Sequence, residues 1–132
     1  MTNGCPSLSG PILIVIALIA FAPSARAQLA GAHAISAEAR GQAAQIFDER
    51  CSACHGAEGR GDGPGAAALK PKPINFHNPN WQKSVSDDQI AKAIVKGGMA
   101  VGLSNQMAPN PDLEDEPDVV KALVARVRSL DK

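Results

Sequence analysis

Two cysteines and a histidine within five residues are the part of the sequence best suited to chemistry. Cys51-Ser52-Ala53-Cys54-His55 has the pattern C-x-x-C-H, which is the attachment sequence of c-type haem. Two thiols three positions apart on a helical turn reach the two vinyl groups of one porphyrin, and the adjacent imidazole reaches the iron from the same face. The sequence therefore predicts one haem c per chain, bound covalently by Cys51 and Cys54, with His55 as an axial ligand.

The same cysteines are compatible with other kinds of site, each of which lacks some support. A thioredoxin-like redox pair follows a β-strand, whereas the residues before Cys51 have a helical pattern. A zinc site needs further ligands, and only His33 and His77 remain, each placed singly. A disulfide is the default for two cysteines in an oxidising compartment. The complete C-x-x-C-H motif favours haem over all three.

An apolar segment near the N-terminus predicts export. Residues 11–22 carry no charge, and small residues ending at Ala27 follow at the positions that a signal peptidase reads. An uncleaved anchor is the alternative, but this run is shorter than the ~20 apolar residues that a spanning helix needs. We therefore expect residues 1–27 to be a signal peptide cleaved before Gln28, and residues 28–132 to be one periplasmic domain without a stable membrane span.

The composition excludes one class of partner and suggests a missing core component. The chain has 13 basic and 13 acidic residues, so no overall positive field would attract nucleic acid, and we expect none as a partner. Aromatic residues make up only 3% of the chain, which is little for the core of one domain. A covalently held porphyrin would supply the rigid apolar surface that these side chains otherwise provide.

The haem motif is expected to close the first helix. Ser36 is a suitable N-cap, and apolar residues at helical spacing continue from it into Cys51. Residues 56–65 then contain five glycines and one proline, which exclude regular structure, and we expect this loop to wrap against the haem. The prolines of residues 70–73 predict an extended segment after it.

Two further helices complete the predicted domain. Ser86 and Gln89 form a capping box for a helix that Gly97-Gly98 ends. The last helix is expected to begin near Asp115, with Pro117 in its first turn and a wide apolar face. No alternation of period two is present, so the sequence predicts an all-α fold.

This order of elements resembles the class I cytochrome c family over roughly residues 34–130. The resemblance implies that the N- and C-terminal helices cross, that the haem lies in the core, and that a methionine is the second axial ligand. Met107 lies in a loop like the family's methionine loop, although Ala108 stands where the first of two prolines is usual, which implies a weaker Fe–S bond. Met99 directly follows Gly97-Gly98, and we interpret it as an apolar gap-filler.

The resemblance also implies which residues surround the haem. A proline carbonyl accepts a hydrogen bond from Nδ1–H of the ligating histidine in that family, and Pro64 and Pro71 are both candidates for this role toward His55. Phe76 and Trp81 lie either at the porphyrin edge, with the Trp81 N–H near a propionate, or in ordinary core packing. The sequence leaves these choices open.

An iron closed by His55 and Met107 leaves no position for a substrate. We therefore expect a monomeric one-electron carrier between respiratory or dehydrogenase partners rather than an enzyme. If Met107 does not bind the iron, the open position would make a small-ligand sensor or a weak peroxidase, and a fixed haem subunit of a larger oxidoreductase is a third hypothesis. Lys70, Lys72 and Lys83 are either a basic patch for an acidic partner or simply solvated.

Overall fold

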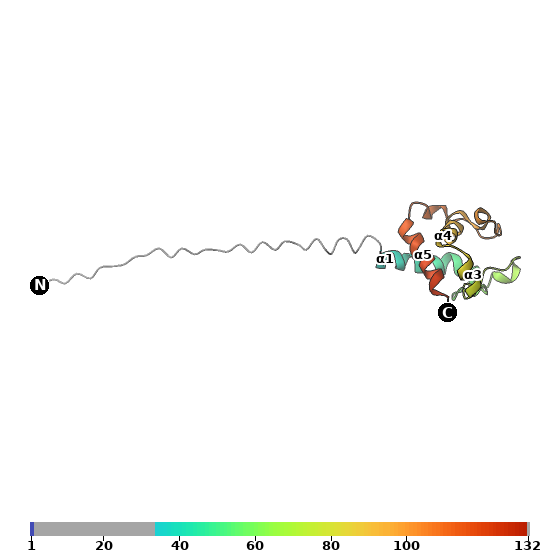
Figure 1. The fold of residues 1–132 in the computed structure, drawn as a ribbon, viewed down its shortest axis with the longest axis horizontal. Coiled ribbons are helices and arrows are strands. Elements are labelled where there is room, and N and C mark those ends of the chain that lie inside the picture. The colour runs from blue at the N-terminus through green and yellow to red at the C-terminus, as the bar shows by residue number, and fades with distance from the viewer. Residues whose placement is uncertain (2–33, 132) are drawn as a thin grey trace. The chain divides into compact units, whose positions relative to one another are not determined.

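The computed structural model describes Met1 and residues 34–131. The predicted signal peptide and its cleavage site lie outside the range 34–131. Within that range the chain forms helices, tight turns and loops, and no strand is present (Figure 1). The predicted all-α class is therefore confirmed.

The attachment motif lies at the end of one continuous helical stretch. Helix α1 spans Ala37–Ile46, the π-helical turn η2 spans Phe47–Cys51, and α2 spans Ser52–His55. Ser36 is the N-cap, as predicted, and its Oγ accepts a hydrogen bond of 3.0 Å from the backbone N–H of Ala39. The π turn is a feature that the helical spacing of apolar residues does not reveal.

Helix α3, Pro79–Ser84, was not among the predicted elements. The side-chain oxygen of Asn78 accepts hydrogen bonds from the backbone N–H groups of Asn80, at 2.9 Å, and Trp81, at 3.2 Å. Asparagine at the N-cap followed by proline at the first helical position is a strong start signal for a helix. The sequence thus contained the information needed to place α3.

The middle helix follows its prediction closely. Helix α4 spans Asp87–Lys96, and its capping box is complete: Gln89 N–H donates to Ser86 Oγ at 3.2 Å, and Ser86 N–H donates to Gln89 Oε1 at 3.0 Å. The helix ends at Gly97, whose φ of 81° is readily adopted only by glycine. The predicted start and stop of this helix are confirmed.

The last helix, α5, spans Pro117–Ser129 and begins with its proline in the first turn, as predicted. Three short 3₁₀ turns precede it along the chain: η3 at Ala66–Ala68, η4 at Gly98–Val101 and η5 at Pro111–Leu113. The turns η4 and η5 flank the segment that carries Met107. The segment with Met107 is therefore a loop with a short 3₁₀ turn at each end.

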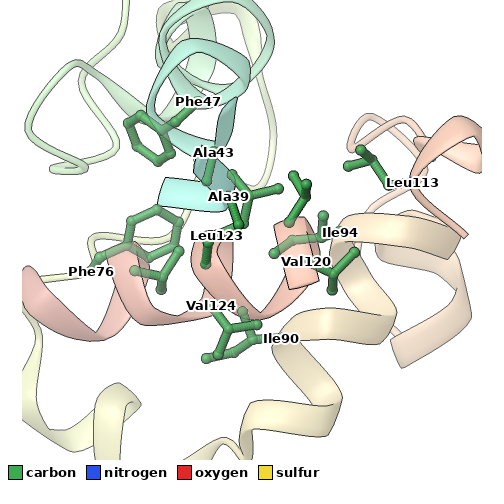
Figure 2. Close-up of a cluster of buried hydrophobic side chains, with 13 residues drawn as sticks. Ala39, Ala43, Phe47, Phe76, Ile90, Ile94, Leu113, Val120, Leu123 and Val124 are labelled. Carbon is green, nitrogen blue, oxygen red and sulfur yellow. The ribbon is translucent and has the colours of Figure 1, made fainter. Parts of the chain in front are cut away.

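The core forms where α1 crosses α5 (Figures 1 and 2). Ala39 and Ala43 are small and buried, which lets the two helices approach closely, and Phe47 and Leu123 are each only 2% exposed. Side chains of α4 and of the connecting segments close this core from the other sides. The contact between the N- and C-terminal helices that the resemblance implied is confirmed.

One buried polar side chain joins the core to the irregular segments. Gln82 in α3 is only 6% exposed. Its Nε2 donates hydrogen bonds to the carbonyl oxygens of Phe76, at 2.7 Å, and Val127, at 3.0 Å. Both donors of the amide nitrogen are therefore satisfied, and the segment around Phe76 is fixed to α3 and α5.

Candidate functional site

Two adjoining cavities surround His55. The larger has a volume of about 350 Å³ and the smaller about 170 Å³. His55, Ile74, Leu103 and Met107 line both of them, so the two cavities form one cleft. Most of the lining side chains are apolar, as in a pocket for a large apolar ligand with a few polar attachment points.

Both cysteines of the C-x-x-C-H motif line the larger part of this cleft. Cys51 and Cys54 are partly buried and are not bonded to each other. Burial raises the pKa of the Cys51 thiol, and the nearby charges of Arg50 and Arg126 offset part of that rise. Two unpaired thiols and the imidazole of His55 thus open on one cavity, which is the arrangement that covalent haem attachment requires.

The imidazole of His55 is held by a backbone carbonyl and an aromatic ring. Its Nδ1 lies 3.3 Å from the carbonyl oxygen of Ile74, and the Phe76 ring stacks on it with centroids 4.6 Å apart and an interplanar angle of 17°. Burial lowers the pKa of His55, while the contact with Ile74 acts in the opposite direction. A neutral ring with its proton on Nδ1 leaves the Nε2 lone pair free to bind a metal.

The carbonyl that faces His55 therefore belongs to Ile74 rather than to Pro64 or Pro71. Pro71 lines the larger part of the cleft, but Pro64 is exposed and lies outside it. Which carbonyl reaches a side chain is decided by the path of the whole loop, and the sequence pattern around a proline does not determine that path.

The glycine-rich loop packs on α2 instead of lining the cleft, contrary to our expectation. The backbone N–H groups of Gly61, Gly63 and Gly65 donate to the carbonyl oxygens at the end of the attachment motif, at 2.8, 3.2 and 2.8 Å. A Cβ on Gly63 would lie 2.5 Å from the carbonyl oxygens of Ser52 and Ala53. The glycines are needed because this loop caps the helix that carries His55 at backbone distance.

Of the two methionines considered as ligands, only Met107 reaches the cleft. Met107 lines both parts of it, whereas Met99 is 68% exposed and lines neither. The carbonyl oxygen of Met107 accepts a hydrogen bond of 3.0 Å from the N–H of Gly98. A Cβ on Gly98 would lie 2.3 Å from the carbonyl oxygen of Ser104, so glycine is required for the methionine loop to pack on the end of α4.

Phe76 and Trp81 lie both at the cleft and at the hydrophobic core. Both line the smaller part of the cleft, and their ring centroids are 5.3 Å apart. Phe76 is also a buried member of the core, and Trp81 packs against that core. The side wall of the cleft is therefore an extension of the hydrophobic core.

Ligand sensing or peroxide chemistry at an open iron would need a polar side chain beside it, and His77, Arg60 and Gln106 are the candidates in the sequence. His77 Nε2 lies 2.7 Å from the carbonyl oxygen of Glu58, and Arg60 forms an ion pair of 3.2 Å with the Glu58 carboxylate. Neither His77 nor Arg60 lines the cleft, whereas Gln106 lines its larger part.

In residues 34–131, no helix has the length and apolar character needed to cross a membrane.

Sequence reasoning missed several residues of the cleft. Ile74 supplies the carbonyl for His55, Leu103 lies between the two parts, and Arg50 and Asn110 line the larger part. No local pattern marks Ile74, Arg50 or Asn110, because each makes a hydrogen bond to a segment at least 16 residues away.

Comparison with known proteins agrees with this geometry. The family model described as cytochrome c matches residues 39–131, which include the C-x-x-C-H motif, the methionine loop and α5. A search of curated proteins finds no match. Haem c is the cofactor of this family, the spacing of Cys51 and Cys54 is that of its attachment, and an apolar cleft with two thiols and a neutral imidazole fits it. Over the matched residues, the chain belongs to the cytochrome c family, whose members are typically electron carriers rather than enzymes.

Proposed function

We propose that this protein is an exported one-electron carrier whose single haem c is bound through Cys51 and Cys54, with His55 and Met107 as axial ligands. The observation that carries the proposal is that His55 and Met107 line the same two cavities, while Met99 lies on the surface. A haem held by these two side chains would have no free iron position. Its chemistry when bound is the uptake and release of one electron.

The chain's own residues favour this use in three ways. The Ile74 carbonyl fixes the tautomer of His55 and increases the basicity of the ring. Apolar side chains exclude water from the cleft and so favour the less charged, reduced iron. The stacking of the Phe76 ring on His55 limits rotation of the imidazole, so a haem bound there would keep its histidine in one orientation.

An optical experiment tests the ligand assignment with a matched control. We would record oxidised and reduced spectra of the wild type, Met107→Leu and Met99→Leu, each with and without carbon monoxide. The expected result is a far-red sulfur-to-iron band in the oxidised wild type and in Met99→Leu, with no response to carbon monoxide. Met107→Leu should lose the band and bind the gas.

The opposite result would favour a different class of protein. A wild type without the far-red band that binds carbon monoxide promptly has an open iron, and ligand sensing or peroxide chemistry would replace electron transfer. Loss of the band in Met99→Leu alone would transfer the ligand role to Met99.

Export is the second part of the proposal. The family match starts at residue 39, after the proposed cleavage site before Gln28, so removal of the leader leaves the matched region intact. The intact mass of the protein from a periplasmic extract is expected to equal residues 28–132 plus one haem. A mass that includes residues 1–27 would exclude cleavage.

A further inference from the structure

The loop that carries Met107 is tied to the rest of the protein by a set of polar contacts that its proposed ligand role does not use. On one side, Lys70 N–H donates to Gln106 Oε1 at 3.3 Å. On the other side, Arg50 donates through Nη1 to Asp112 Oδ2 at 2.7 Å and to Asn110 Oδ1 at 3.5 Å. These contacts join the segments on the two sides of the larger cavity.

Asn110 is the centre of the second group of contacts. Its Nδ2 donates to the carbonyl oxygen of Ile94 at 2.9 Å, and its backbone N–H donates to the carbonyl oxygen of Val95 at 3.0 Å. Both carbonyls belong to the last turn of α4, where no helical N–H is available to them. Asn110 therefore caps α4 while its side-chain oxygen faces Arg50.

Arg50 provides the link to the attachment motif because it immediately precedes Cys51. The guanidinium bridges Asn110 and Asp112, which are 60 and 62 positions away along the chain. Asn110 lies only three residues after Met107, so a shift of Asn110 would be transmitted to Met107 through a short piece of backbone. The contacts thus connect the segment that binds the haem covalently to the loop that carries Met107.

We infer that Arg50 and Asn110 are positioning residues that hold the Met107 loop across the cleft and thereby determine how readily Met107 leaves the iron. This inference rests on the proposed ligation by Met107. The capping bonds of Asn110 fix the loop to α4, and the Arg50 bonds fix it to the residue before Cys51. Neither residue touches the iron, and both act through the position of the loop.

The test uses holoprotein variants with a matched control. Arg50→Met removes the guanidinium but keeps most of the aliphatic stem, and Asn110→Ala removes the side-chain bonds but keeps the backbone bond to Val95. Arg60→Met is the control, since Arg60 is also an exposed arginine in an ion pair, but one that lies away from the cleft. The measurements are haem attachment after denaturation, the far-red band against pH, and carbon monoxide affinity of the reduced protein.

We expect all three variants to retain covalent haem. Carbon monoxide affinity should rise about two- to fourfold in Arg50→Met, as for loss of an exposed ion pair, and about tenfold in Asn110→Ala, as for loss of a partly buried hydrogen bond. The far-red band should disappear at a lower alkaline pH in both, and Arg60→Met should match the wild type.

A second background shows whether the effect passes through Met107. In Met107→Leu the loop no longer holds a ligand, so adding Arg50→Met should leave carbon monoxide affinity unchanged. An equal increase in that background, or a far-red band in Arg50→Met that matches Arg60→Met, would overturn the inference. If Asn110→Ala fails to fold, Arg50→Met decides alone, because its side chain is 42% exposed.

The proposed function and this inference fail in different ways. A wild type without the far-red band removes the ligand role of Met107 itself. A wild type with the band, combined with variants that behave like the control, leaves His/Met ligation intact and removes only the positioning role of Arg50 and Asn110.

Discussion

The guanidinium of Arg128 donates hydrogen bonds to both oxygens of Gln82, the main-chain carbonyl at 2.7 Å and the side-chain amide oxygen at 2.8 Å. The same group donates to the carbonyl oxygen of Val85 at 2.7 Å and forms an ion pair of 2.7 Å with Asp87. Since Gln82 itself bonds to Phe76 and Val127, this one arginine completes a network that joins α3, α4 and α5.

Arg128→Met is therefore expected to lower the free energy of unfolding by about 2–4 kcal/mol, because it leaves three partly buried acceptors without a donor. Lys121→Met is the control, since the Lys121 side chain is 68% exposed and its one ion pair within residues 34–131 is with Asp118, at 3.4 Å; it should change stability by less than about 0.5 kcal/mol. Denaturant unfolding of the wild-type and the two variant holoproteins measures both changes in the free energy of unfolding. Equal midpoints would show that the network adds nothing to stability.

Two glycines with opposite surroundings give a matched pair of substitutions. Gly41 lies inside α1, and a Cβ there would meet nothing within 4 Å, whereas a Cβ on Gly98 would lie 2.3 Å from the Ser104 carbonyl oxygen and 3.2 Å from Met107 Cβ. Gly41→Ala should stabilise the protein by about 0.5–1 kcal/mol. Gly98→Ala should destabilise it by about 1–3 kcal/mol and weaken the far-red band, because the methionine loop must move away. Thermal unfolding and the oxidised spectrum check the pair, and a band of full strength in Gly98→Ala would contradict the close packing.

The ion pair between Arg50 and Asp112 predicts a definite pH dependence. The hydrogen bond from Arg50 lowers the pKa of Asp112 below its usual value, and the attraction of the guanidinium acts in the same direction. A carboxyl whose pKa is lower in the folded state stabilises the fold above its unfolded pKa, and this contribution is lost as the pH falls through the folded value. The stability difference between wild type and Asp112→Asn should therefore be constant near neutral pH and shrink below about pH 4. A difference that grows on acidification would have the wrong sign.

Lys70 and Lys72 are exposed, and Lys72 lines the larger part of the cleft. If they attract anions to the haem edge, replacing both with glutamine should slow oxidation of the reduced protein by ferricyanide about two- to fivefold at low salt. The difference should vanish near 1 M salt, where the Debye length is about 3 Å. Lys92→Gln is the control on α4, and an equal loss of rate in that variant would point to net charge alone.

The elements with local signals were predictable, and those that depend on distant contacts were not. The capping box of Ser86 and Gln89 fixes the start of α4 within four residues of sequence, so its prediction is confirmed. The Ile74 carbonyl reaches His55 from 19 positions away, and Arg50 reaches Asp112 from 62. No short pattern encodes such contacts, which explains why the sequence suggested Pro64 and Pro71 for the carbonyl that Ile74 supplies and why Arg50 and Asn110 were missed.

The π turn η2 determines what a one-residue deletion before the attachment motif would do. A π turn is equivalent to one extra residue inserted in an α-helix, so every side chain after it is turned by about 100° relative to an uninterrupted helix. Deleting an exposed residue inside this turn, such as Glu49, would keep the stretch helical and leave the packing of Ala39 and Ala43 in place. It would nevertheless rotate Cys54 and His55 to another side. The buried side chains before the turn therefore face the core, and the turn sets the direction in which the side chains after it face the cleft.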